Sequence, residues 1–248
     1  MTDIPLAKAL KRAAQEPSQR PAFYRALMEM EADVFVIGHT DQPDLNAQGH
    51  HTIPAGANVS LVNWEKADGS PVIPFFTHLE ALQLAIDVET SYLSLPARSL
   101  FELTRGTTLF LNPKSDHGKE FVPHEIDALL DTGMNQKADT RVVEKETRVM
   151  LGQPAEYPTA MVEALQQLLP DHPGVTAACL CLMHDPEMSQ KPTLVVGFEG
   201  LDLEVAMSEA GSVVVDTAPS GQAVDFVVVD GTGIGEYMKK SGAFYKKS

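Results

Sequence analysis

The chain has little cysteine and no long apolar run. Cys179 and Cys181 are its only cysteines among 248 residues, which excludes a disulfide framework and gives no sign of an oxidising compartment. No window approaches the roughly 18 consecutive apolar residues of a membrane-spanning helix. The first residues, "MTDIPLAKALKRAAQEP", contain no apolar segment of the kind found in signal peptides. These absences predict a cytoplasmic protein without a membrane partner.

Positive charge is also scarce. Lys and Arg number 19 against 34 Asp and Glu, so the net charge is −15 at pH 7. Proteins bind nucleic acids and anionic membranes through clustered Lys and Arg, so this excess of negative charge argues against either as the main partner. Residues 155–230 contain twelve acidic residues and one basic residue, Lys191, whereas the last ten residues contain four lysines and no acid. The acidic block either keeps the protein soluble or forms a surface for a basic protein partner.

The composition is that of a folded protein, and the length allows one large domain or two of ordinary size. Apolar residues make up 44% and charged residues 21%, and 248 residues suffice to bury a substantial core. The stretch "DTGMNQKADTRVVEKE" is polar and has no apolar period, which is typical of a linker. We therefore expect an α+β protein with an N-terminal domain at residues 1–133, a linker at 134–144 and a C-terminal domain at 145–248.

The N-terminal half alternates helical and strand patterns. Two short helices are expected in the first thirty residues, followed by a strand at "DVFVIGHT". Asp68-Gly69 predicts a hairpin, and Pro71 and Pro74 predict that its second strand lies at a sheet edge. Thr77 and Glu80 form a capping-box pattern that predicts the start of a helix. These elements predict a mixed α+β domain.

The C-terminal half has a regular order of elements. We expect a strand near 146–151, a helix opened by Pro158, the strands "GVTAACLCLMH" and "PTLVVGFEG", a helix at 202–210 and the strand "AVDFVVVD", in this order. This βαββαβ order is typical of a ferredoxin-like domain, with an antiparallel sheet covered by helices on one face.

The glycine-rich segment "VVVDGTGIGEYMKK" begins like a phosphate-binding loop. However, Glu236 stands where the dinucleotide fingerprint needs its third glycine, and only thirteen residues follow Gly235, too few for a second parallel strand. The chain also lacks G-x-x-x-x-G-K-[ST]. We therefore interpret the glycines as a turn that lets the C-terminal segment fold back.

A polar loop collects residues that bind metals. "GHTDQPDLNAQGHHT" contains His39, Asp41, Asp44, His50 and His51, but in no spacing of an H-x-x-x-H pair or an H-E-x-x-H motif. The loop is either simply solvated or, as an alternative, the centre of a metal-assisted hydrolase with a bound water as nucleophile.

The two cysteines lie in an expected strand and point to the same face of the sheet. Small and apolar neighbours favour a core position, and a thiol relay is the weaker alternative, because a reactive thiolate needs nearby positive charge. The chain contains no G-x-S-x-G elbow and no kinase motif set. No catalytic residues are therefore assigned.

Two segments are the candidates for partner contact. The polar turn in "NPKSDHGKEF" lies between apolar elements, a usual place for recognition residues. The C-terminal "SGAFYKKS" is either a last docked strand or a displayed aromatic and basic anchor. The candidate contact residues are Asn112, Lys114, Asp116, His117, Phe244 and Tyr245.

Several stretches together carry a family resemblance. In the first half these are "VIPFFTHLEALQLA", "LPARSLFEL" and "LFLNPKSDHGKEFVPHEIDALL"; in the second half they are "LVVGFEG", "VDFVVVD" and "GAFY". They resemble the N-terminal and C-terminal domains of the SseB family, bacterial proteins named for enhanced serine sensitivity. The resemblance covers nearly the whole chain.

The resemblance implies binding and no catalysis. It offers no catalytic residues to carry over, and family members look like adaptors with a link to serine or sulfur amino-acid metabolism through a sulfurtransferase partner. Related N-terminal domains look like those of immunity proteins that neutralise bacterial toxins. We therefore expect a non-enzymatic protein-binding adaptor that needs no cofactor and whose partner is a sulfurtransferase or another protein with a basic surface.

Overall fold

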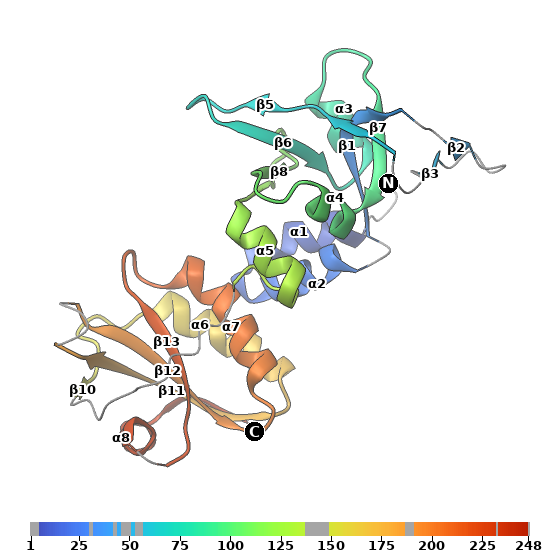
Figure 1. Cartoon of the computed structure of the whole chain (residues 1–248). Helices are drawn as coiled ribbons and strands as arrows, with labels where there is room; N and C mark the ends of the chain where they lie inside the picture. The colour runs from blue at the N-terminus through green and yellow to red at the C-terminus, as the bar shows by residue number, and fades with distance from the viewer. Residues whose placement is uncertain are drawn as a thin grey trace. The chain divides into compact units, whose positions relative to one another are not determined.

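The computed structural model of the protein describes residues 5–29, 32–41, 44–45, 51–52, 57–136, 149–186, 191–231 and 233–247. The chain divides into two compact units, each with its own sheet (Figure 1). Unit 1 comprises Met1–Ala14 and Ala22–Asn135, and unit 2 comprises Gln15–Pro21 and Gln136–Ser248. The predicted two-domain α+β fold is confirmed. Most of the predicted linker, residues 134–144, lies outside the described residues.

Unit 1 is built on a seven-stranded sheet in the order β4-β1-β6-β8-β9, with β5 paired to β6 and β7 paired to β1. The strands are β1 (Asp33–Thr40), β4 (Val59–Leu61), β5 (Trp64–Glu65), β6 (Pro71–Phe76), β7 (Tyr92–Pro96), β8 (Leu109–Leu111) and β9 (Lys119–Phe121). The helices are α1 (Pro5–Gln15), α2 (Arg20–Met28), α3 (Leu79–Ala85), α4 (Ala97–Leu103) and α5 (Pro123–Thr132). A separate pair joins β2 (Asp44–Leu45) to β3 (His51–Thr52).

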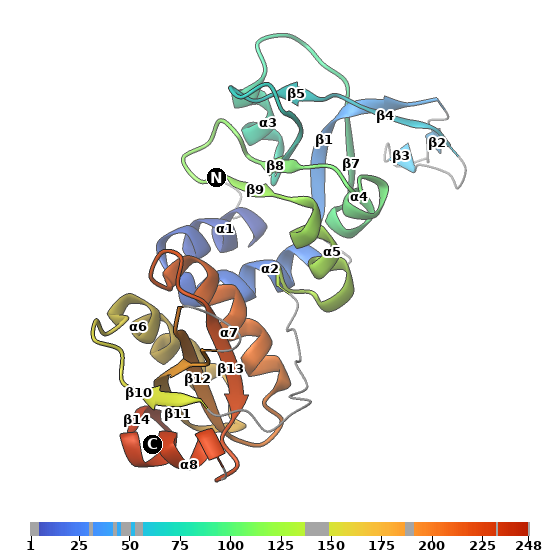
Figure 2. The ribbon, with the colours of Figure 1, turned by 60° about the vertical axis from the view of Figure 1, so that its left-hand side comes forward.

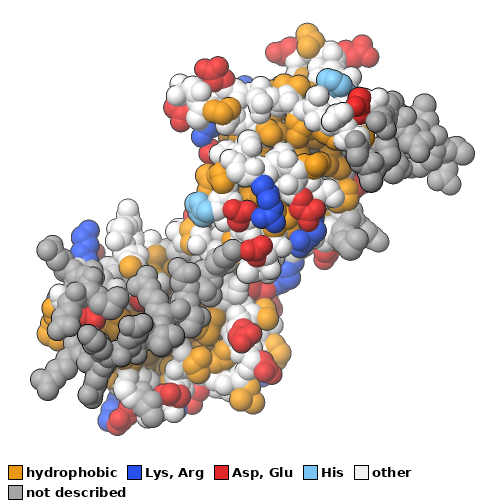
Figure 3. All heavy atoms as spheres, in the orientation of Figure 1, with side chains coloured by type: hydrophobic (Ala, Val, Ile, Leu, Met, Phe, Trp, Pro, Cys, Tyr) orange, Lys and Arg blue, Asp and Glu red, His pale blue; other side chains and the backbone are white. Residues whose placement is uncertain are grey.

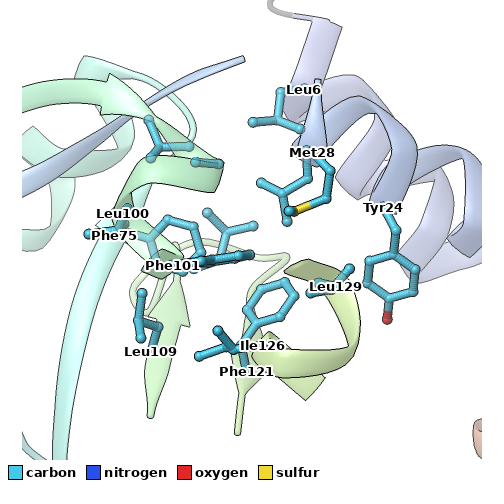
Figure 4. Packing of buried hydrophobic residues seen from close by; sticks show 14 of the residues in the cluster. Leu6, Tyr24, Met28, Phe75, Leu100, Phe101, Leu109, Phe121, Ile126 and Leu129 are labelled. Atoms are coloured by element: carbon cyan, nitrogen blue, oxygen red, sulfur yellow. The ribbon is translucent and has the colours of Figure 1, made fainter. Parts of the chain in front are cut away.

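The core of unit 1 lies between this sheet and its helices. Phe75, Phe101 and Phe121 come from β6, α4 and β9, and their ring centroids lie 5.5 to 5.9 Å apart. Leu6 of α1 and Leu129 of α5 belong to the same cluster of buried residues (Figure 4). Because each ring buries a large apolar area, this cluster is a main source of the unit's stability.

The predicted hairpin at Asp68-Gly69 is confirmed, but β6 does not lie at the sheet edge. Gly69 has φ of 81°, and Trp64 faces Val72 across the turn. β6 lies inside the sheet, between β8 on one side and β5 and β1 on the other. Pro74 is tolerated because β5 pairs only with residues 71–72 and β1 only with residues 75–76. At Pro74 itself, the missing N–H therefore costs no ladder hydrogen bond.

The predicted capping box at Thr77 and Glu80 is wrong. The residue before α3 is His78, and it makes no side-chain cap hydrogen bond. Thr77 is instead buried and hydrogen-bonded to Asn112, which lies 35 positions further along the chain. The tertiary contact therefore takes the hydroxyl that the local pattern assigns to the helix.

Unit 2 contains a five-stranded sheet in the order β10-β11-β12-β13, with β14 paired to β11. The strands are β10 (Met150–Gly152), β11 (Val175–His184), β12 (Thr193–Gly200), β13 (Val224–Val228) and β14 (Ala243–Lys246). The helical segments are α6 (Thr159–Leu168), α7 (Glu204–Thr217), α8 (Gly233–Ser241), and the 3-10 turns η1 (Pro17–Gln19) and η2 (Leu169–Asp171). In η1, Ser18 Oγ donates a hydrogen bond to Gln167 Oε1 over 3.2 Å.

The ferredoxin-like prediction has the correct element order but needs correction in its pairing. The βαββαβ sequence is present from β10 to β13. However, β12 and β13 are adjacent and parallel, joined through α7 in a simple βαβ unit, whereas β10 pairs antiparallel with β11. Element order does not fix strand order, because apolar strands pair with any neighbour whose faces match.

The sheet of unit 2 is covered on both faces, whereas helices on one face were predicted. One face packs against α6 and α7 around Leu165, Val196 and Phe198. The other face packs against α8, where Met238 lies among Cys181 and Val195. Figures 1 and 2 show α8 on the opposite side of the sheet from α6 and α7. The chain beyond β13 supplies this extra layer, which a six-element pattern does not include.

Candidate partner-binding site

The turn between β8 and β9 carries the exposed polar residues predicted from the sequence. β8 and β9 are antiparallel neighbours, so residues 112–118 form their connection at the end of the sheet. Lys114 and Asp116 are exposed, and His117 is half-buried. Within the described part of the chain, neither Lys114 nor Asp116 forms an ion pair. Both charges are therefore available to a partner.

The buried side chain of Asn112 fixes the start of this turn through hydrogen bonds to Thr77. Its side chain is 3% exposed, and its backbone has a left-handed φ of 50°. Its Oδ1 accepts from the Thr77 backbone N–H over 3.0 Å, and its Nδ2 donates to Thr77 Oγ1 over 3.0 Å. Asn112 is therefore corrected from a contact residue to a positioning residue, because its amide is already satisfied inside the protein.

Two further groups restrict the same turn. The Thr77 hydroxyl lies 2.7 Å from His78 Nδ1, which extends the hydrogen-bond chain from Asn112. A Cβ atom at Gly118 would lie 2.8 Å from the carbonyl oxygen of Leu111 and 2.9 Å from that of Asn112, so only glycine fits. The sequence alone did not identify Thr77 or Gly118 as residues that shape this turn. A polar residue or a glycine at the end of a strand is common in turns of every kind, so neither residue by itself indicates a binding site.

Ion pairs fix the strand that follows the turn. Lys119 Nζ lies 3.0 Å from Glu125 Oε1, and Glu125 also accepts from Asn135 Nδ2 and from the Val122 backbone N–H. On the next residue, Glu120 pairs with Lys66 at 2.9 Å, and the hydrogen bond to Glu120 raises the pKa of Lys66. The base of the turn is thereby tied to α5 and to the β5–β6 hairpin.

The C-terminal segment is a docked strand, so the displayed-anchor alternative is set aside. β14 pairs with β11, with Tyr245 opposite Ala178. Phe244 and Tyr245 are both half-buried and pack against the core of unit 2. The Phe244 carbonyl accepts a hydrogen bond from Gln166 Nε2 over 2.6 Å. Phe244 and Tyr245 therefore belong to a docked strand, and their partly exposed side chains stay candidate contact residues.

The polar loop with the histidines is described only in part. His39 is exposed in β1, His50 lies outside the described residues, and of Asp44 and His51 only the backbone is described. Both carboxylate oxygens of Asp41 accept hydrogen bonds from Asn58, which lower the pKa of Asp41. Among the residues with described side chains, no group of three His, Cys, Asp or Glu could hold a metal ion.

The glycine-rich segment forms the predicted turn. Gly231 and Gly233 both have left-handed φ values, and they lead into α8, after which β14 returns to the sheet. A Cβ atom at Gly235 would lie 3.2 Å from the backbone nitrogen of Asp230. The glycines therefore allow the chain to reverse tightly between β13 and α8.

The two cysteines face the core beneath α8, as predicted. Cys179 and Cys181 are 3% and 0% exposed and belong to the cluster that includes Met238. Burial raises the pKa of Cys179, and burial raises that of Cys181 to about 11. Both groups are therefore neutral thiols at neutral pH, which is contrary to what a thiol relay requires.

The raised thiol pKa predicts a loss of stability in alkali. Below pH 9.0, the ordinary thiol value, folded and unfolded chains both keep the Cys181 proton. Between pH 9.0 and about 11, the unfolded chain loses that proton first, so the free energy of unfolding falls as the pH rises. We expect urea unfolding to show a smaller alkaline loss in Cys181→Ala than in the wild type. Equal losses in the two proteins would contradict this assignment.

The geometry defines a two-domain α+β protein with a rigid, polar turn at the end of its first sheet. Comparison with known proteins identifies the family of the chain. The SseB protein N-terminal domain matches residues 6–128, and the SseB protein C-terminal domain matches residues 143–247. The chain therefore belongs to the SseB family.

Two curated relatives agree with this assignment. Protein SseB of Escherichia coli strain K12 and Protein SseB of Shigella flexneri are each 39% identical to the chain over 225 residues. The alignments cover 90% of this chain and 83% of each relative. No solved structure matches the chain. None of the helices in the described part has both the length and the apolar character needed to cross a bilayer.

Proposed function

We propose that the protein is a non-enzymatic adaptor that binds another protein through the β8–β9 turn. The observation that supports this is the pre-organisation of the turn: Asn112, Thr77 and Gly118 fix its backbone while Lys114 and Asp116 remain exposed. A turn that is already ordered loses little conformational entropy on binding, so its charged groups contribute more fully to affinity.

Charge indicates the kind of partner. Residues 155–230 carry a net charge of −11, from twelve acids and one base. The exposed carboxylates among them would accelerate association with a basic protein, and this advantage would fall as salt screens their charge. We propose a sulfurtransferase, or another protein with a basic surface, as the partner, and serine or sulfur amino-acid metabolism as the setting. This matches what the family resemblance implies.

The test is a pulldown from the native bacterial lysate with the tagged full chain, at low and high salt, with bound proteins identified by mass spectrometry. We expect one stoichiometric partner that is retained at low salt and reduced at high salt. The double variant Lys114→Ala with Asp116→Ala should lose it, because both exposed charges of the turn are removed.

A matched control uses another exposed charge pair of unit 1. Arg105 and Asp127 form an ion pair at 3.1 Å with side chains 53% and 47% exposed. The double variant Arg105→Ala with Asp127→Ala also leaves the net charge unchanged, and we expect it to retain the partner. Equal retention by the two double variants would refute the turn as the contact, and the absence of any partner at low salt would refute the adaptor function.

A further inference from the structure

β13 ends the sheet of unit 2. It pairs with β12 on one side, and among the described residues no strand pairs with its other side. The opposite edge of the sheet is different, because β14 covers residues 177–179 of β11 and β10 covers residues 182–184. Among the described strands, β13 therefore forms the one long outer edge of this sheet.

The hydrogen bonds show which groups of β13 face outward. The Leu194 N–H donates to the Ala223 carbonyl, and the Val229 N–H donates to the Phe198 carbonyl. In a parallel pair, alternate residues of a strand direct both backbone groups to the same neighbour. Residues 223, 225, 227 and 229 therefore face β12, and the N–H and C=O groups of Val224, Phe226 and Val228 face away from it.

Within the described residues, β13 lacks the sequence features that usually prevent strand addition. Edges are normally shortened, charged or interrupted by proline. In unit 1, β4 and β9 have three residues each, β9 includes two charged residues, and β7 ends in Pro96. β13 has five residues in unbroken register, contains neither proline nor lysine, and carries one charge, Asp225.

The side chains beside this edge are apolar and partly exposed. Val224 and Phe226 are half-buried against the face covered by α7, and Val228 is 54% exposed. Figures 1 and 2 show β13 and α7 side by side, and Figure 3 shows hydrophobic side chains interspersed with carboxylates at the surface over α7. An added strand would find apolar contacts for the side chains that it directs to this face.

We propose that the outer edge of β13 binds an extended, basic segment of the partner protein, which pairs with it as an additional strand. Backbone hydrogen bonds to Val224, Phe226 and Val228 fix the register of the added segment, and its lysine or arginine side chains are attracted by Asp225 and by the net negative charge of residues 155–230. The inference rests on the proposed function, since it names the part of the partner that unit 2 recognises.

The probe is a capped peptide of alternating lysine and valine, titrated at low salt against the full chain. Amide hydrogen exchange followed by NMR should show new protection at Val224, Phe226 and Val228. Val228→Pro removes one outward N–H and should weaken binding about tenfold, whereas Val228→Ala keeps that N–H and should weaken it less. Retained protection at Val227 and Val229 in the proline variant establishes that β12 and β13 remain paired.

Four results would overturn the proposal. These are no binding of the peptide, binding without protection of the three outward amides, equal binding of a backbone N-methylated peptide, and protection that grows with protein concentration in the absence of peptide. The last result would assign the edge to a second copy of the chain. Because the Lys114 and Asp116 double variant should bind the peptide normally, failure here is distinguishable from failure of the proposed turn contact.

Discussion

Replacing Asn112 by alanine should destabilise unit 1 by about 3 kcal/mol. The variant loses both hydrogen bonds to Thr77 and leaves a buried N–H and a buried hydroxyl without this partner. Alanine must also adopt the left-handed φ of 50°, which costs a residue with a Cβ atom about 1 kcal/mol. Trp64, the only tryptophan, lies in unit 1, so urea unfolding followed by its fluorescence reports on this unit.

Two further variants separate these contributions. Asn112→Gly loses the same hydrogen bonds but adopts the positive φ without strain, so it should be less destabilising than alanine. Lys114→Ala changes an exposed residue of the same turn and should alter stability by less than about 0.5 kcal/mol. If Asn112→Ala unfolded at the wild-type urea concentration, the amide would not be what holds the turn.

Replacing Gly200 by alanine should destabilise unit 2 by about 3 to 5 kcal/mol. Gly200 has φ of 147°, and a Cβ atom there would lie 1.9 Å from the carbonyl oxygen of Gly174. Both clashing atoms are fixed to the backbone, so the end of β12 must move away from the start of β11. The pairing of Val175 with Gly200 would then be lost. Clash and backbone strain together place this substitution among the most damaging single changes.

The two cysteines provide the measurement, because both are buried in unit 2. Their rate of labelling by a thiol reagent during urea unfolding follows this unit alone. Gly221→Ala is the matched control: its φ of 72° is also left-handed, but nothing lies within 4 Å of its added Cβ atom. It should cost about 1 kcal/mol, from strain alone. Equal effects of the two substitutions would show that the Gly174 contact is unimportant.

The sequence predicted local features where one short segment decides the outcome. The Asp68-Gly69 hairpin, the core-facing pair Cys179 and Cys181, and the reversal at Gly231 and Gly233 were all found as expected. In each case the deciding interaction lies within a few residues: a left-handed turn position or the alternation of side chains along a strand.

Predictions failed where a distant segment competed for the same group. The residues around Thr77 predict that it caps a helix. Its hydroxyl instead accepts a hydrogen bond from Asn112, which follows the neighbouring strand β8. Asn112 lies in a polar stretch that is typical of a recognition turn, yet its side chain is buried. Pro74 predicts an edge strand, yet β6 lies inside the sheet. Pro74 is tolerated there because β1 and β5, on one side of β6, both leave that residue unpaired.

The amino-acid sequence by itself determined the two α+β domains, the order of their elements, the acidic character of the second domain and the family. These depend on periodicity, composition and motifs, which are properties of the chain read in order. Only the tertiary structure decided which strands are neighbours, which polar residues of the β8–β9 turn are buried, and that β13 is an outer strand among those the structure describes. Those features depend on contacts between residues far apart in sequence, and many pairings of apolar strands satisfy the same local pattern.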